Sequence, residues 1–220
     1  MSTYARPVWA EPVFHDAHGR AFTYGDRWGG ESPPEDKYSV DSHPERFAPL
    51  HEVADALVTH LLGTYDVGTD DDLSCAADLL HPREDVVRAV RLTPTDPDAA
   101  PMTFVWTSYP GVVIHAGVLH DFPYPNCGCD ACDETAGSQA EEMEYQVFAV
   151  AAGGYREAVR GRLSPWIDTA LRAPDGSRSG TSSSRVSAAL DRSRLTGGRR
   201  RLRSLPNGWQ PWPVRASHLS

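Results

Sequence analysis

The sequence is poor in two residues that are common in most proteins. Its 220 residues include one lysine, Lys37, against twenty arginines, and two isoleucines, Ile114 and Ile167. Neither bias has a folding reason, and both are typical of the codon usage of a GC-rich genome. Part of the arginine, alanine and proline content therefore carries no information about function.

Long apolar runs are also lacking. The longest, such as Val112-Val113-Ile114, fall far short of the roughly twenty residues that a membrane-spanning helix needs. Met1 to Pro12 shows neither the apolar stretch nor the cleavage pattern of a secretory signal. We therefore expect a cytoplasmic protein without a membrane partner. In that reducing compartment the four cysteines are expected not to form disulfides.

The net charge of −9 is distributed unevenly along the chain. Residues 1–155 carry a net charge of −18, and residues 156–220 a net charge of +9. The basic run from Arg199 to Arg203, with Trp209 and Trp212, fits either a nucleic-acid-binding tail or a segment that docks on the acidic body. The overall acidity favours docking, so nucleic acid is not expected as a partner.

Proline and glycine, 18 of each, divide the chain into three parts. Residues 1–40 show no periodicity and predict an irregular arm. Residues 41–175 predict an α+β core that contains the clustered cysteines. Residues 176–220 predict a mobile loop, a basic helix and an extended tail rich in tryptophan and proline. We expect a single domain in which helices cover one face of an antiparallel sheet.

Two helices and three strands are expected in the core. Apolar residues at helical spacing predict a helix from Pro49 to Gly63, preceded by a capping box at Ser42–Glu45. A second helix is expected from about Asp133 to Ala152. The expected strands are 86–92, 103–108 and 112–118, of which the last two form a hairpin. Elsewhere the sequence predicts an acidic turn at 66–72, a loop at 177–184 and a basic helix over 186–205 broken at Gly197-Gly198.

Three of the four cysteines lie within six residues, in the segment Cys127-Gly-Cys129-Asp-Ala-Cys132. Two thiolates at the spacing of Cys129 and Cys132 reach one metal ion from a tight turn, and Gly128 permits the reversal that brings in Cys127. Cys132 stands at the expected start of the second helix, whose dipole stabilises a thiolate. We predict a metal site, with zinc as the first choice. Iron–sulfur or Cu(I) ligation and a redox dithiol are alternatives.

Zinc takes four ligands, so the three thiolates leave one position to fill. His120, seven residues before the first clustered cysteine, is the first candidate, and His115 and Cys75 are alternatives. A water molecule at this position would instead make the site open and suited to catalysis. The carboxylates nearest in sequence that can activate such a water are Asp121, Asp130, Asp133 and Glu134.

Several sequence blocks resemble a family of uncharacterised bacterial proteins from high-GC organisms. The resemblance runs from about residue 24 to residue 213. It is carried by PPEDKYS from Pro33, HPERF from His43, HDFP from His120 leading into CGCDACDE from Cys127, and the GWQPWP ending from Gly208. It implies a complete protein of one domain, and it implies no catalytic residue.

Three functions fit these features. The first is a small cytoplasmic binding or regulatory protein, with a protein as its partner, whose fold is held by a structural zinc ion. The second is a zinc-dependent hydrolase with an open coordination position, and the third is a thiol-based redox or sensor protein. The sequence contains no phosphate-binding loop, no His-Glu-x-x-His helix and no Gly-x-Ser-x-Gly elbow, so the first function is preferred.

Overall fold

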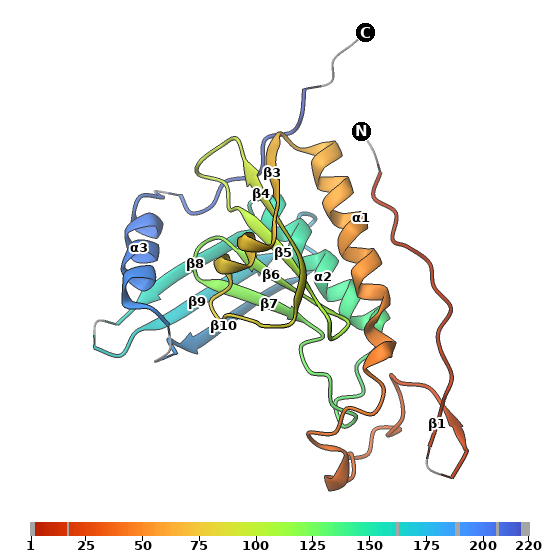
Figure 1. Cartoon of the computed structure of the whole chain (residues 1–220). Coiled ribbons are helices and arrows are strands. Elements are labelled where there is room, and N and C mark those ends of the chain that lie inside the picture. The colour runs from red at the N-terminus through yellow and green to blue at the C-terminus, as the bar shows by residue number, and fades with distance from the viewer. Residues whose placement is uncertain (1–2, 17, 162, 188–189, 206, 217–220) are drawn as a thin grey trace.

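The computed structural model describes residues 3–16, 18–161, 163–187, 190–205 and 207–216. Within these ranges, ten strands form three antiparallel sheets, and three α-helices pack around them (Figure 1). The chain is therefore an α+β protein of one domain, as its sequence predicts. No helix in the described ranges is long and apolar enough to cross a membrane.

The central sheet is a five-stranded meander in which each strand pairs with the next along the chain. Its strands are β3 (Val67–Asp71), β4 (Val86–Pro94), β5 (Met102–Thr107), β6 (Gly111–Ala116) and β7 (His120–Tyr124). The predicted hairpin is confirmed, since β5 pairs with β6 in antiparallel register. The prediction of an acidic turn at 66–72 is wrong, because β3 forms there by backbone pairing with β4. All its side chains after the first are exposed, so it shows no apolar pattern.

Both faces of the central sheet are covered. On one face, Phe104 and Ile114 lie opposite one another and belong to the main core, which the helices α1 and α2 complete. On the other face, Val105 and Val113 pack with residues of the 3-10 helix η3 (Leu73–Asp78). The sequence predicts helices on one face only. The second cover is missed because η3 is too short to show helical periodicity.

The two core helices lie close to their expected positions. Helix α1 (Pro49–Thr64) begins at the predicted proline and extends one residue past the predicted end. Helix α2 (Ala136–Ala151) begins later than expected because Thr135 caps it. The Thr135 side chain accepts a hydrogen bond of 3.0 Å from the backbone N–H of Ser138, and the Ser138 hydroxyl accepts one of 3.2 Å from that of Thr135.

A second sheet of three strands follows α2, in the order β10-β9-β8. Its first two strands in the chain are β8 (Tyr155–Arg160) and β9 (Trp166–Arg172). Where the sequence predicts a mobile loop at 177–184, the structure has strand β10 (Ser179–Arg185). Every side chain of β10 is exposed, so backbone pairing with β9 forms this strand, and its serine-rich sequence gives no strand signal.

The basic helix α3 (Arg192–Arg203) is shorter than the predicted helix and runs unbroken through Gly197 and Gly198. Gly198 is buried, and a Cβ atom at this position would lie 2.8 Å from both Cγ and Cδ1 of Leu119. This glycine therefore does not break the helix. Instead, it allows the helix to pack closely against the sheet.

The C-terminal tail is held by its tryptophans. Trp209 and Trp212 are both buried. Trp209 Nε1 donates a hydrogen bond of 2.9 Å to the Glu157 carboxylate, and Trp212 Nε1 donates one of 2.8 Å to the Ala100 carbonyl. The two tryptophans therefore anchor the tail on the core.

The N-terminal arm runs beside α1 (Figure 1), and its described residues include the short strands β1 (Phe14–His15) and β2 (Ala21–Phe22) and the 3-10 helix η1 (Glu35–Lys37). Near its start, the ring of Tyr4 packs edge-on against His60 of α1 and Phe148 of α2, with ring centroids 5.6 Å and 5.3 Å apart. The arm therefore lies against both core helices before it reaches the cysteine loop.

Candidate metal centre

The three clustered cysteines lie on the loop between β7 and α2. Their sulfur atoms all lie within 4.8 Å of one another. The Sγ atoms of Cys127 and Cys129 are 3.3 Å apart, and those of Cys129 and Cys132 are 3.4 Å apart. Cys127 and Cys129 are half-buried and Cys132 is exposed, so an ion can reach the sulfurs from solvent. Among the described residues, no other group of three metal-ligating side chains is this close together.

A turn and one glycine shape this loop. The backbone N–H of Cys132 donates a hydrogen bond of 3.2 Å to the carbonyl of Cys129, which closes the turn that the spacing predicts. Gly128 does not adopt a left-handed backbone. Instead, a Cβ atom at this position would lie 2.2 Å from the hydroxyl of Tyr109 and 3.1 Å from Oδ2 of Asp41. The glycine is needed because other side chains approach it closely.

The sequence position of Cys132 predicts that it stands at the start of the helix, but in the structure it does not. Helix α2 begins at Ala136 with Thr135 as its cap, so the cap rather than the thiol meets the first free N–H groups. Contacts with the sulfurs of Cys127 and Cys129 raise the pKa of the Cys132 thiol to about 12. Burial raises the pKa of Cys129, but hydrogen bonds to its sulfur outweigh burial and lower that pKa. Hydrogen bonds between sulfurs link the three thiols, and a metal ion that binds them would displace the thiol hydrogens.

The N-terminal arm encloses the loop, and Asp130 is at the centre of this contact. Asp130 is 2 % exposed. Its Oδ1 accepts hydrogen bonds from the hydroxyl of Tyr24 at 2.9 Å and the backbone of Ser42 at 3.2 Å, and its Oδ2 accepts one from the Ser42 hydroxyl at 2.8 Å. Burial raises the pKa of Asp130, but these hydrogen bonds outweigh it and lower that pKa. Ser42 therefore holds the cysteine loop, and the capping box predicted there does not form.

Arg46 is the second buried charge at this contact and is 3 % exposed. Its Nη2 donates to the carbonyl of Gly128 at 2.6 Å, and its Nε donates to that of Glu134 at 3.2 Å. Its guanidinium lies 4.0 Å from the ring centroid of Tyr24 and pairs with Asp41 at 3.2 Å. One side chain of the 3-10 helix η2 (Pro44–Phe47), which lies between the arm and α1, thus binds both ends of the cysteine segment.

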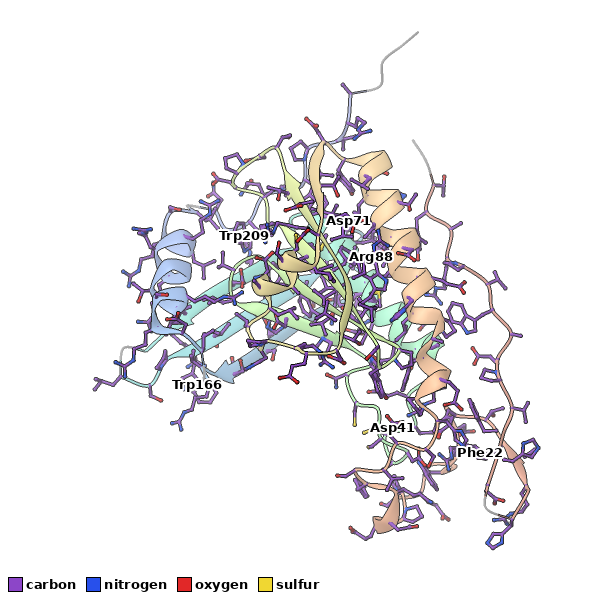
Figure 2. The ribbon with its side chains drawn as sticks, viewed as in Figure 1. Phe22, Asp41, Asp71, Arg88, Trp166 and Trp209 are labelled. Carbon is purple, nitrogen blue, oxygen red and sulfur yellow. The ribbon has the colours of Figure 1, made fainter. Side chains whose placement is uncertain are left out.

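A cavity of about 350 Å³ opens beside Cys129. Ser39, Asp41 and Tyr109 are among its polar lining residues. Figure 2 shows Asp41 at the same end of the molecule as Phe22 of the arm. Both oxygens of Asp41 already accept hydrogen bonds, from Tyr109 at 2.5 Å and from Arg46 at 3.2 Å. The cavity gives a water-sized ligand access to the cluster. The carboxylate of Asp41 in its lining, however, is already engaged in hydrogen bonds with protein groups.

The four carboxylates expected near an open site each hold another group. Asp121 lies 2.7 Å from a histidine nitrogen on β6, and Asp130 holds the arm. One oxygen of Asp133 accepts a hydrogen bond from the backbone of Arg27 at 2.8 Å. Glu134 accepts one from the backbone of Cys127 at 3.0 Å, and burial raises its pKa. Glu134 is therefore the carboxylate that bonds directly to a cysteine of the cluster.

The structure does not bring His120 to the sulfurs. His120 begins β7, and because a strand rises about 3.3 Å per residue, its Cα lies about 13 Å from that of Tyr124 at the other end. Its ring packs against Phe122 at 4.4 Å, and burial lowers its pKa to about 4. His115 instead pairs with a carboxylate of β7, and Cys75 is the buried residue of η3, packed on Val105 and Val113. None of the three joins the sulfur cluster.

Arg46 and Tyr109 belong to this site although the sequence does not predict them there. Arg46 belongs to HPERF, one of the blocks that carry the family resemblance. A charged residue within such a block is the sequence feature that could have pointed to this site. Tyr109 lies in the β5–β6 turn, far from the cysteines in sequence, so only the fold brings it to the site.

Comparison with known proteins gives one match. A family model described as a family of unknown function, DUF6226, matches residues 10–216. The match includes most of the arm, the central sheet, the cysteine loop and the tryptophan tail. No curated protein and no solved structure matches the chain.

Proposed function

Because the chain belongs to DUF6226, a family of unknown function, we propose its function from the site alone. Cys127, Cys129 and Cys132 bind one zinc ion, and this ion holds the N-terminal arm on the core of a small binding or regulatory protein. The observation that supports the proposal best is the approach of three sulfurs within 4.8 Å on a loop enclosed by the arm. In this proposal the metal is structural and the site is not catalytic.

The sulfur geometry supports a tetrahedral ion. Zinc–sulfur bonds of about 2.3 Å place two sulfurs about 3.8 Å apart. The observed separations of 3.3 and 3.4 Å need to grow by only a few tenths of an ångström. Three thiolates and one Zn²⁺ carry a net charge of −1, and the buried guanidinium of Arg46, which also pairs with Asp41, lies beside them at the carbonyl of Gly128. Soft thiolates also favour zinc over magnesium or calcium.

The surroundings of the loop support a structural role. The described parts of the arm and the loop share no helix or sheet. Two backbone hydrogen bonds join them, from Asp130 to the carbonyl of Val40 and from Ala131 to that of Lys37, together with the buried charges of Asp130 and Arg46. Structural zinc sites contribute about 10–16 kcal/mol of apparent binding free energy in small domains. One ion at the cysteines would therefore fix the loop, and through Asp130 and Arg46 it would fix the arm.

Metal analysis with one matched control tests this proposal. We expect one zinc ion per chain in protein purified under reducing conditions, and a large fall in Tm on chelation. Cys129→Ser should lose the metal. Cys75→Ser should keep it, because Cys75 is a buried residue of η3 on the far face of the sheet. Metal-free wild-type protein, or equal zinc content in both variants, would refute the proposal.

A zinc-dependent hydrolase is the second candidate, favoured by the cavity beside Cys129. In that case a water molecule fills the fourth position, and a small ligand can replace it. The absorption spectrum of cobalt-substituted protein should then change when imidazole is added. An unchanged spectrum would favour four protein ligands. The same spectrum recorded for His120→Gln tests whether this histidine supplies the fourth ligand.

A thiol redox role is the third candidate, favoured by sulfur separations of 3.3 and 3.4 Å. A disulfide has a length of about 2.05 Å, so a shift of just over 1 Å would join two of the sulfurs. Mild oxidation should then remove two hydrogens, seen by mass spectrometry, and added zinc should protect the thiols. Thiols that stay reduced under these conditions would argue against this role.

We also propose a cytoplasmic location and a protein as the partner. The net charge of −9 makes attraction to nucleic acid weak. Filter binding with duplex DNA at about 0.15 M salt should therefore show no retention. Retention of DNA would direct attention to the basic helix α3.

A further inference from the structure

Five polar side chains form one row across the central sheet. The strand register places them in line from β3 to β7, as Asp70, Arg91, Thr103, His115 and Asp121. The row lies on the face opposite the main core, and the neighbouring row on the same face is apolar. Side chains directly opposite one another in such strands are about 5 Å apart and can interact.

Asp121 determines which ring nitrogen of His115 carries the hydrogen. One oxygen of Asp121 lies 2.7 Å from His115 Nδ1, and the other accepts a hydrogen bond of 2.8 Å from the backbone of Leu80. A carboxylate only accepts, so Nδ1 of the neutral ring carries the hydrogen and Nε2 carries the lone pair. His115 is 6 % exposed, and its Nε2 has no hydrogen-bond partner among the described residues.

A cavity of about 340 Å³ lies between this row and helix α3. His115 and Thr103 line it from the sheet, and Arg194 lines it from α3. The carboxylate of Asp78 also lines it, but both oxygens are occupied. Arg91 donates to them at 2.7 and 2.8 Å, and Thr103 donates to one of them at 2.6 Å.

Arg194 supplies the positive charge of this cavity. Its Nη1 donates to the carbonyls of Leu79 at 2.6 Å and Ala77 at 3.3 Å, which fixes the guanidinium at the wall. Its Nε and Nη2 make no hydrogen bond within the described part of the chain. Since Asp78 and Arg91 neutralise each other, the lining has a net positive charge and an unpaired imidazole nitrogen.

We propose that this cavity binds the phosphate group of a small phosphate monoester. The free N–H groups of Arg194 pair with two phosphate oxygens, as a guanidinium fork does. A third oxygen shares its hydrogen with Nε2 of His115, because a phosphate monoester has a second pKa of about 6. A carboxylate has no such hydrogen near neutral pH. The cavity volume is in the range of small-molecule sites and exceeds the size of bare phosphate.

Nuclear magnetic resonance of the full ¹⁵N-labelled chain tests this site at pH 6. The probes are inorganic phosphate, glycerol phosphate and adenosine monophosphate, with acetate for comparison. We expect the Nε2 signal of His115 to shift with each phosphate, and at least one monoester to bind more tightly than inorganic phosphate. Acetate should bind about tenfold more weakly. No binding of any phosphate, or binding without a shift at His115, would overturn the proposal.

Two substitutions on α3 test the role of Arg194. Arg194→Gln should lower the affinity for the monoester about tenfold or more. Arg192→Gln is the matched control, since Arg192 lies on the same helix and lines a different surface hollow. Because Arg194 also holds backbone carbonyls, Tm is measured for each variant, and Arg194→Lys should recover part of the affinity. Equal losses in the two glutamine variants would show general attraction to α3 and overturn the site.

Discussion

The hydroxyl of Tyr24 donates a hydrogen bond of 2.9 Å to Oδ1 of Asp130, which joins the irregular arm to a buried carboxylate of the cysteine loop. The two residues are 106 positions apart in the chain. Neither segment lies in a helix or strand at this point, so the contact depends on such side chains and on two backbone hydrogen bonds, from Asp130 to Val40 and from Ala131 to Lys37. The stability of the arm should therefore respond to this one carboxylate.

Asp130→Ala should lower the free energy of unfolding by about 2–4 kcal/mol. The substitution leaves the Tyr24 hydroxyl and two donors of Ser42 without their buried acceptor, and each such loss costs about 1–3 kcal/mol before relaxation. Urea unfolding gives the change. Asp26→Ala is the control on the same arm, because Asp26 is exposed. A similar small change in both variants would contradict the role given to Asp130.

Arg46→Lys should lower the free energy of unfolding by about 2 kcal/mol although the charge is kept. Arg46 reaches the carbonyls of Gly128 and Glu134 from two separate nitrogens of its planar guanidinium, whereas lysine has a single nitrogen and does not reproduce this geometry. Arg20→Lys is the matched control, since the Arg20 side chain is 78 % exposed in its ion pair with Asp16. Thermal unfolding of the two variants separates buried geometry from charge. Equal stability would show that the fork of Arg46 is not needed.

Sequence patterns predicted the parts of the fold whose signal is local. Helix α1 and the β5–β6 hairpin have apolar side chains at regular spacing, and the cysteine cluster is visible as a spacing of thiols. Strands β3 and β10 were missed because nearly all their side chains are exposed and only backbone pairing defines them. The arm's hold on Asp130 is a long-range contact between segments without periodicity, so no local pattern indicates it.

His120 should make stability depend on pH. Burial lowers its pKa from 6.5 to about 4 in the folded state. Above pH 6.5 the histidine is neutral in both states. As the pH falls from about 6.5 to 4, the unfolded chain takes up a proton that the folded chain does not, so stability is lost. The loss through this residue should reach at most about 3 kcal/mol.

His120→Gln removes this titration while keeping a polar side chain at the start of β7. The difference in unfolding free energy between wild type and His120→Gln should shift against the wild type as the pH falls. Carboxylates titrate in both proteins, so subtraction removes their effect. The same subtraction for His18→Gln, at an exposed position, gives the background. A difference that stays constant with pH would show that His120 is not held neutral.

Two adjacent glycines of α3 should respond oppositely to alanine. At Gly197 no atom lies within 4 Å of an added Cβ, so Gly197→Ala should stabilise the protein by about 0.5–1 kcal/mol through helix propensity. At Gly198 the added Cβ would meet the buried side chain of Leu119 at 2.8 Å. Gly198→Ala should therefore destabilise the protein by about 1–2 kcal/mol, because overpacking outweighs the same propensity gain.

This pair of variants also tests how α3 positions the cavity wall. Gly198 lines the cavity that contains His115 and Arg194, whereas Gly197 faces away from it. A helix displaced by Gly198→Ala moves Arg194 away from the polar row, so the affinity for a phosphate monoester should fall together with Tm. Gly197→Ala should raise Tm and leave that affinity unchanged. If both variants raise Tm, close packing of α3 on Leu119 is not what the glycine provides.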